Sequence, residues 1–126
     1  MENNFQKKLE KIFKNNKKNI FITIDSKKYT YGDLNKISDK ISQILLNQEI
    51  KTDSVIAISA EKNIYVFASI FACLKIGCAY TLIDFMMPKN RLNKILEKSD
   101  PKLNLLTTKK NLRKLGKRKY IFLTKS

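Results

Sequence analysis

The chain has 126 residues, enough for one domain with a hydrophobic core, and 43% of them are apolar. It contains no histidine and only two cysteines, Cys73 and Cys78. Two thiols alone cannot close a structural zinc site, so we interpret both as buried free thiols. The formal net charge is +15: residues 1–19 carry six basic and two acidic side chains, residues 20–100 eleven and nine, and residues 101–126 nine and none.

The basic side chains do not predict a specific nucleic-acid partner. Only Arg91, Arg113 and Arg118 of the 26 basic residues are arginine, and lysine is the poorer residue for bidentate contacts to phosphates or base edges. A small basic binding module acting through residues 101–126 remains the weakest alternative function, because the excess charge of that segment is its sole support.

The first predicted element is a basic amphipathic helix within residues 1–19, where Phe5, Leu9, Ile12 and Phe13 recur at helical spacing among lysines. We separate it from a domain over residues 20–126. The amino end shows no secretory signal pattern, so we expect a cytoplasmic protein.

A hairpin and a long helix come next. Residues 20–25 form the first predicted strand, Ser26 and Lys27 the turn, and residues 28–30 the returning strand. Thr30 and Asp33 have the spacing of a capping box, which predicts a helix from about Tyr31 to Asn47.

Alternating strands and helices follow. Residues 55–59 read VIAIS, a β-branched run typical of a strand buried on both sides. Helical spacing over residues 64–74 predicts a helix that ends at Gly77, and a strand over residues 79–83 comes after it. Pro88 and Pro101 bound the next predicted helix.

The carboxyl-terminal part is expected to hold two further strands, residues 103–107 and 120–123, around a short basic helix near residues 111–115. The pattern as a whole predicts an α/β fold: an initial β-hairpin, then alternating βα units that form a mainly parallel sheet. Residues 64–83 are an alternative candidate for a membrane span. Lys75 near the middle of that stretch, and Gly77 after it, favour the helix–turn–strand interpretation, so no membrane span is expected.

Four sequence blocks stand out in the chain: YTYGDLNKISDKISQIL from Tyr29, VIAIS from Val55, LKIGCAYTLIDFMMPKNRLNKILEKS from Leu74, and LNLLT from Leu103. In order and spacing, these blocks resemble motifs of the adenylate-forming (AMP-binding) enzymes. The family counterparts are TYxELNxxSNxLAxxL, a VAI strand, LKAGGAYVPIDPxxPxxRLxxILxxS, and a strand ending in LLT. The match is nearest to nonribosomal peptide synthetase adenylation domains and carrier-protein ligases.

The chain also departs from the family pattern. Glu49 replaces a glycine in the loop before the VAI strand, and Asp53 and Ser54 replace a Gly-Asp pair. Leu82 and Phe85 replace two prolines in the block that begins at Leu74. Without these prolines, the backbone after the predicted strand at residues 79–83 would be less constrained.

The resemblance implies a family reaction in which ATP activates a carboxylic or amino acid as an acyl-adenylate that is then transferred to a thiol. We expect this chain to be the amino-terminal, truncated part of the first subdomain of such an enzyme and to be inactive alone. The family's Ser/Thr/Gly-rich phosphate-binding loop is absent, since Gly32, Gly77 and Gly116 are isolated. ATP and magnesium would bind in the full-length family, and no cofactor is expected in this chain.

We assign no catalytic, cofactor-binding or metal-binding residue. Tyr31, Tyr80 and Asp84 are interpreted as structural, and Lys75 as a cation at a helix carboxyl end. Asp84 and Arg91 are a candidate surface ion pair.

Partners follow from the same reasoning. We expect the missing remainder of an adenylating enzyme, or a carrier protein, and self-association through uncovered apolar surface. The alternative function is a complementing subunit of a split adenylating enzyme.

Overall fold

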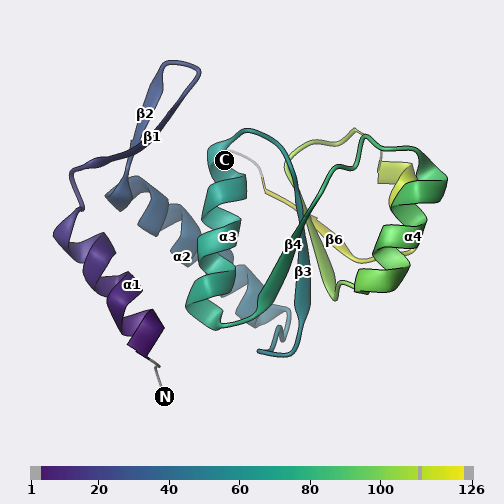
Figure 1. The fold of residues 1–126 in the computed structure, drawn as a ribbon, viewed down its shortest axis with the longest axis horizontal. Helices are drawn as coiled ribbons and strands as arrows, with labels where there is room; N and C mark the ends of the chain where they lie inside the picture. The colour runs from purple at the N-terminus through teal and green to yellow at the C-terminus, as the bar shows by residue number, and fades with distance from the viewer. Residues whose placement is uncertain (1–3, 111, 124–126) are drawn as a thin grey trace.

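A computed structural model describes residues 4–110 and 112–123 (Figure 1). The elements in chain order are α1 (Asn4–Asn15), β1 (Ile20–Ile24), β2 (Lys27–Thr30), α2 (Tyr31–Asn47), β3 (Val55–Ser59), α3 (Ile64–Ile76), β4 (Ala79–Ile83), α4 (Lys89–Ser99), β5 (Leu103–Leu106), the 3₁₀ helix η1 (Leu112–Leu115) and β6 (Tyr120–Phe122).

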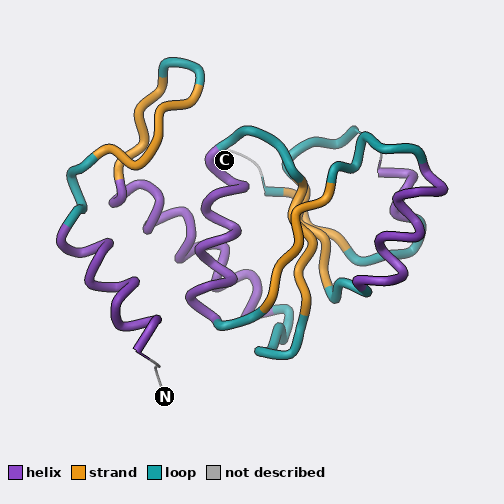
Figure 2. The backbone as a smooth tube through the Cα atoms, in the orientation of Figure 1, coloured by secondary structure: helices purple, strands orange, loops and turns teal. Residues whose placement is uncertain are grey.

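Strands β3 to β6 form one parallel sheet in the order β4-β3-β5-β6. The antiparallel pair β1-β2 is a separate hairpin that projects away from this sheet (Figure 2). Helices α1 to α3 lie on one side of the sheet, and α4 lies on the other. The predicted α/β fold, with an initial hairpin and a parallel sheet, is confirmed.

The start of α2 follows directly from its capping residues. The Thr30 side chain accepts the Asp33 N–H at 3.0 Å, and the Asp33 carboxylate accepts the Thr30 N–H at 2.9 Å. This reciprocal pair satisfies two backbone donors that a helix start otherwise leaves open. The helix then buries one face through Leu34, Ile41 and Leu45.

Helix α3 is capped at both ends, and its end at Gly77 is the one that the sequence predicts. The Asn63 side chain accepts the Val66 N–H at 3.1 Å at its start. Gly77 ends the helix at φ 87°, a left-handed conformation in which glycine has no Cβ penalty. No described helix has the length and apolar content needed to span a bilayer, so residues 64–83 form helix, turn and strand.

Two hydrophobic clusters lie on opposite faces of the sheet. The larger one joins α1, α2 and α3 to the Ile56, Ile58, Leu103 and Leu105 side chains. The smaller one packs α4 and η1 against the other face, with Ala57, Ile83, Phe85, Leu92, Leu96, Leu106 and Leu115 as its buried members. Strand β3 therefore contributes alternate residues to both clusters, which explains its continuous apolar run.

The hairpin turn lies one residue earlier than the sequence predicts. Asp25 and Ser26 have φ values of 48° and 68°, and Ile24 pairs with Lys27 across them. A two-residue hairpin turn with positive φ at both central residues matches the twist of the flanking strands. Asp tolerates that conformation better than most residues, so Asp25 belongs to the turn and Lys27 to the returning strand.

The structure shows the surroundings of Glu49, Leu82 and Phe85, which stand where the family pattern has a glycine and two prolines. Glu49 has a φ of 59°, so its position requires the left-handed conformation that a glycine adopts easily. Phe85 is buried in the smaller cluster, where its ring fills core volume. Leu82 stays exposed on β4, which is an edge strand of the sheet.

Glu49→Gly is expected to raise the free energy of unfolding by about 0.5–1 kcal/mol, because the left-handed penalty removed exceeds the backbone entropy that glycine adds. Urea unfolding followed by circular dichroism measures this change. Glu97→Gly, on the exposed side of α4, is the matched control and is expected to destabilise by about 1 kcal/mol. Equal losses for both variants would contradict the strain at Glu49.

Candidate functional site

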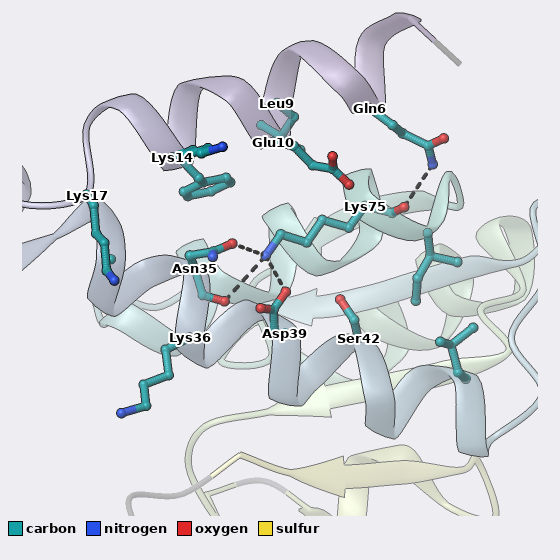
Figure 3. Close-up of a pocket in the computed structure, with 14 residues that line it drawn as sticks. Gln6, Leu9, Glu10, Lys14, Lys17, Asn35, Lys36, Asp39, Ser42 and Lys75 are labelled. Atoms are coloured by element: carbon teal, nitrogen blue, oxygen red, sulfur yellow. Dashed lines mark hydrogen bonds and ion pairs between the residues drawn. The ribbon is translucent and has the colours of Figure 1, made fainter. Parts of the chain in front are cut away.

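Lys75 joins the two longest motif blocks of the sequence. Its ammonium, at the end of α3, donates to Asn35 Oδ1 and Ser38 Oγ at 2.6 Å each and to the Asn35 carbonyl oxygen at 3.3 Å. It also pairs with Asp39 Oδ1 at 2.7 Å (Figure 3). The three partners follow i, i+3, i+4 spacing on α2, which places them on one face of that helix.

Helix α1 closes over the same lysine. The Phe13 ring centroid lies 4.9 Å from the Lys75 ammonium. Gln6 Nε2 donates to the Lys75 carbonyl oxygen at 2.8 Å (Figure 3). Phe13 also makes edge contacts with Tyr31 and Phe71. Lys75 therefore holds α1, α2 and α3 together at one point, and its side chain is only 19% exposed.

A groove of about 860 Å³ runs between α1 and α2 beside this contact point. Apolar side chains of Leu9, Phe13, Leu46 and Ile76 share its lining with charged ones, among them Lys14, Lys17, Lys36 and Asp39. The groove holds no pairing of a nucleophile with a general base, so its residues fit a helix-packing role rather than a reaction.

Lys75 is the functional detail that the sequence interpretation missed. The sequence alone predicts an effect on the helix dipole, yet the ammonium reaches across to α2. One signal was available: Asn35, Ser38 and Asp39 place polar atoms on one face of the helix, and Ser38 is fully buried. A buried hydroxyl on α2 requires a polar partner from a neighbouring element.

The carboxyl ends of β3 and β5 form a second polar cluster. In parallel sheets, ligands commonly bind where neighbouring chain connections leave in opposite directions, and the order β4-β3-β5-β6 puts that point between β3 and β5. Here the Thr107 hydroxyl donates to Glu61 Oε2 at 2.9 Å and accepts from Asn63 Nδ2 at 3.0 Å. The three side chains satisfy one another and tie the two loops together.

The glycines do not provide a phosphate cradle. Such a cradle needs free backbone N–H groups that point at the phosphate. All three glycine N–H groups already donate hydrogen bonds to backbone carbonyl oxygens. The acceptors are the carbonyl oxygens of Lys17 for Gly32 at 3.0 Å, Cys73 for Gly77 at 2.8 Å, and Arg113 for Gly116 at 3.3 Å. A Cβ added at Gly32 would lie 3.0 Å from that Lys17 oxygen, so this glycine serves close packing. The residues present do not fit the triphosphate of ATP.

The other residues considered from the sequence lie apart from one another. Tyr31 begins α2 in aromatic contact with Phe13 and Phe21, and Tyr80 is exposed on the edge strand β4. Asp84 Oδ1 accepts the Met86 N–H at 2.9 Å and forms no ion pair with Arg91. Within residues 4–110 and 112–123, no group of three or more carboxylate or thiol side chains is placed to hold a metal ion. The assignment of no site residue stays a prediction.

Comparison with known proteins identifies the family of the chain. A sequence model of the family described as AMP-binding enzyme matches residues 9–123. Gramicidin S synthase 1 from Brevibacillus brevis is 35% identical over 94 residues, and tyrocidine synthase 1 from Brevibacillus parabrevis is 33% identical over 86 residues. These matches cover 75% and 68% of this chain but only 8% of either synthase.

Solved structures share the fold at low sequence identity. Klebsiella oxytoca NpsA, in complex with 3-hydroxyanthranilyl-AMSN, aligns with 94% of this chain at a TM-score of 0.81 and 15% sequence identity. VinN aligns with 94% of this chain at a TM-score of 0.83 and 15% sequence identity. The chain spans 24% and 31% of those two structures. The fold and the sequence match agree, and the predicted resemblance is confirmed: this chain belongs to the AMP-binding enzyme family, with adenylation domains of peptide synthetases among its relatives.

Proposed function

We propose that this chain forms the opening part of the first subdomain of an adenylation domain, and that it supplies scaffold rather than catalytic groups. The Lys75 contact carries this proposal. Lys75, from the third motif block, is bound by Asn35, Ser38 and Asp39 of the first block, so residues that resemble the family pack against one another.

In this proposal the complete enzyme converts a carboxylate or amino acid and ATP into an acyl-adenylate and pyrophosphate, and then transfers the acyl group to a thiol. ATP and magnesium bind to parts of the enzyme beyond these residues, because the glycine N–H groups here are already donated. A carrier protein is the proposed thiol partner. One structural relative is described as an artificially fused adenylation–PCP di-domain from Klebsiella oxytoca. A cytoplasmic location is part of the same proposal.

The purified 126-residue chain is expected to catalyse no ATP–pyrophosphate exchange with any amino acid or aryl or fatty acid, since a preorganised phosphate site supplies much of the rate in such chemistry. Exchange of labelled pyrophosphate into ATP measures this activity. An intact adenylation domain assayed in parallel shows that the assay detects the reaction. Exchange above a no-protein blank, with contaminating synthetases removed, would contradict the scaffold role.

The unpaired edges of the sheet favour one second candidate, a complementing subunit of a split enzyme. Among the described residues, β4 pairs only with β3 and exposes Tyr80 and Leu82, and β6 at the other edge exposes Tyr120. Edge strands with exposed apolar side chains pair readily with a further strand. Self-association through the same edges remains a proposal.

The exchange assay separates the two candidates when the polypeptide encoded downstream of this chain is added as a separate protein. Activity of the mixture alone, lost with Leu82→Lys at the β4 edge, would favour the complementing subunit. Leu82 is 48% exposed, so the charge at this position is expected to leave the fold intact. Lys98→Glu, on the exposed side of α4, is the charge-changing control and is expected to retain activity.

A further inference from the structure

The two cysteines of the chain flank the end of α3. Cys73 lies in the last turn of that helix, and Cys78 directly follows its terminal glycine. Cys78 stands where the family pattern quoted above has the second glycine of LKAGG, so the pair is a property of this chain rather than of that pattern.

The helix end brings these two residues together. Gly77 and Cys78 both donate their N–H groups to the Cys73 carbonyl oxygen, at 2.8 and 3.1 Å. In a helix end of this type, the residue after the glycine packs against the residue whose carbonyl it bonds. This backbone hydrogen bond holds the two residues side by side, and a disulfide requires roughly 4.4–6.8 Å between their Cα atoms.

The thiols also interact directly. A side-chain hydrogen bond between them raises the pKa of Cys73, with burial adding to the effect, and the same bond lowers the pKa of Cys78. Of the two sulfurs, Cys78 is the one on which a thiolate is favoured. A thiolate is the form that attacks a disulfide.

Solvent exposure also favours Cys78 as the first of the two cysteines to react. Cys73 is fully buried, whereas Cys78 is 7% exposed and has exposed neighbours, Gly77 and Ala79, on either side. Cys78 is therefore the more accessible of two buried sulfurs, and Cys73 is the candidate resolving thiol.

We propose that Cys73 and Cys78 form a reversible intramolecular disulfide, a redox modification site that clamps the carboxyl end of α3. With a small disulfide such as oxidised glutathione as oxidant, the Cys78 thiolate attacks one sulfur and releases one glutathione thiolate. Cys73 transfers its proton to that released thiolate and then attacks the Cys78 sulfur, which releases the second glutathione thiolate. Two protein thiols are oxidised and one glutathione disulfide is reduced to two thiols.

The clamp would act on the point where the three helices meet. Lys75 lies between the two cysteines in the chain, its ammonium holds α2, and its carbonyl holds Gln6 of α1. Fixing the last turn of α3 therefore fixes the position from which three helices are held together.

Glutathione redox buffers test the proposal on the full 126-residue chain, with acid quenching and intact mass spectrometry of the products. The expected product is a single chain lighter by two hydrogen atoms. Its equilibrium constant against glutathione should be roughly tenfold or more higher for the native chain than for the chain in urea, because the native state holds the two thiols together.

Cys73→Ala and Cys78→Ala are the matched controls. Cys73→Ala is expected to give only a mixed disulfide at Cys78, and Cys78→Ala is expected to stay reduced because Cys73 is fully buried. Oxidation should also raise the thermal midpoint of the unsubstituted chain and of neither variant. Mixed disulfides or covalent dimers as the main oxidised product of the unsubstituted chain would overturn the proposal. So would an equilibrium constant that is no higher in the native state than in urea.

Discussion

Replacing Lys75 with methionine is expected to lower the free energy of unfolding by about 1.5–3 kcal/mol, the range for losing charge-assisted hydrogen bonds at a mostly buried site. Methionine keeps most of the apolar stem against Phe13 but removes the donor that Asn35 and Ser38 accept from. Urea denaturation followed by circular dichroism measures the loss.

Asp39→Asn provides the matched comparison. Asp39 contributes the one full charge among the Lys75 partners, but its side chain is 64% exposed, so water screens the ion pair. We expect a loss below about 1 kcal/mol for this variant. Combining the two substitutions measures their coupling energy. A larger loss for Asp39→Asn than for Lys75→Met would show that the ion pair, and not the hydrogen bonds to Asn35 and Ser38, carries the interaction.

Much of the fold could be predicted because each local signal agrees with its neighbours. The capping box at Thr30 and Asp33, the β-branched run from Val55, and Gly77 each mark an element boundary where the structure has one. These signals act within a few residues of the chain. Local spacing is therefore sufficient to place the elements and their order.

The contacts that organise the site could not be predicted in the same way. Lys75 and Asn35 are 40 residues apart, and the hydrogen bond between Asn63 and Thr107 spans 44. Such pairs form only when the parallel sheet brings distant segments together. Amphipathic spacing also overstated the burial of α1: Leu9 and Phe13 are buried, but Phe5 and Ile12 remain about half exposed. One helix face can meet its neighbours only over a limited width.

The basic carboxyl-terminal segment has a structural role that its composition concealed. Lys114 Nζ donates to the Met87 carbonyl at 2.9 Å and to the Phe85 carbonyl at 3.3 Å, and Arg118 donates to Asn93 Oδ1 at 3.3 Å. Of the predicted short helix, Leu112–Leu115 is a 3₁₀ turn, and Asn111 lies outside the described residues. Part of the positive charge therefore fastens this segment to α4 and the loop before it.

Deleting residues 109–126 is expected to abolish cooperative unfolding. The deletion removes β6, which pairs with β5, and Leu115, whose side chain is buried in the smaller cluster. Truncating one buried leucine lowers the free energy of unfolding by about 2–5 kcal/mol, and the total for a domain is about 5–15 kcal/mol. Losing a whole strand and its core residues therefore removes most of the stability of the folded state. Thermal denaturation followed by circular dichroism should show no sigmoidal transition.

A second variant, in which Lys110, Lys117 and Lys119 are replaced by glutamine, removes positive charge from this segment while keeping its contribution to the fold. All three are exposed and make no ion pair within the described residues, so each change is expected to stay within about 0.5 kcal/mol. Binding to duplex DNA, measured by fluorescence anisotropy at several salt concentrations, should be weak and independent of sequence. Every lysine–phosphate interaction that the substitutions remove should reduce the salt slope of binding by about 0.9.

A cooperative transition of the deleted chain at an unchanged midpoint would show instead that residues 109–126 are dispensable for the fold.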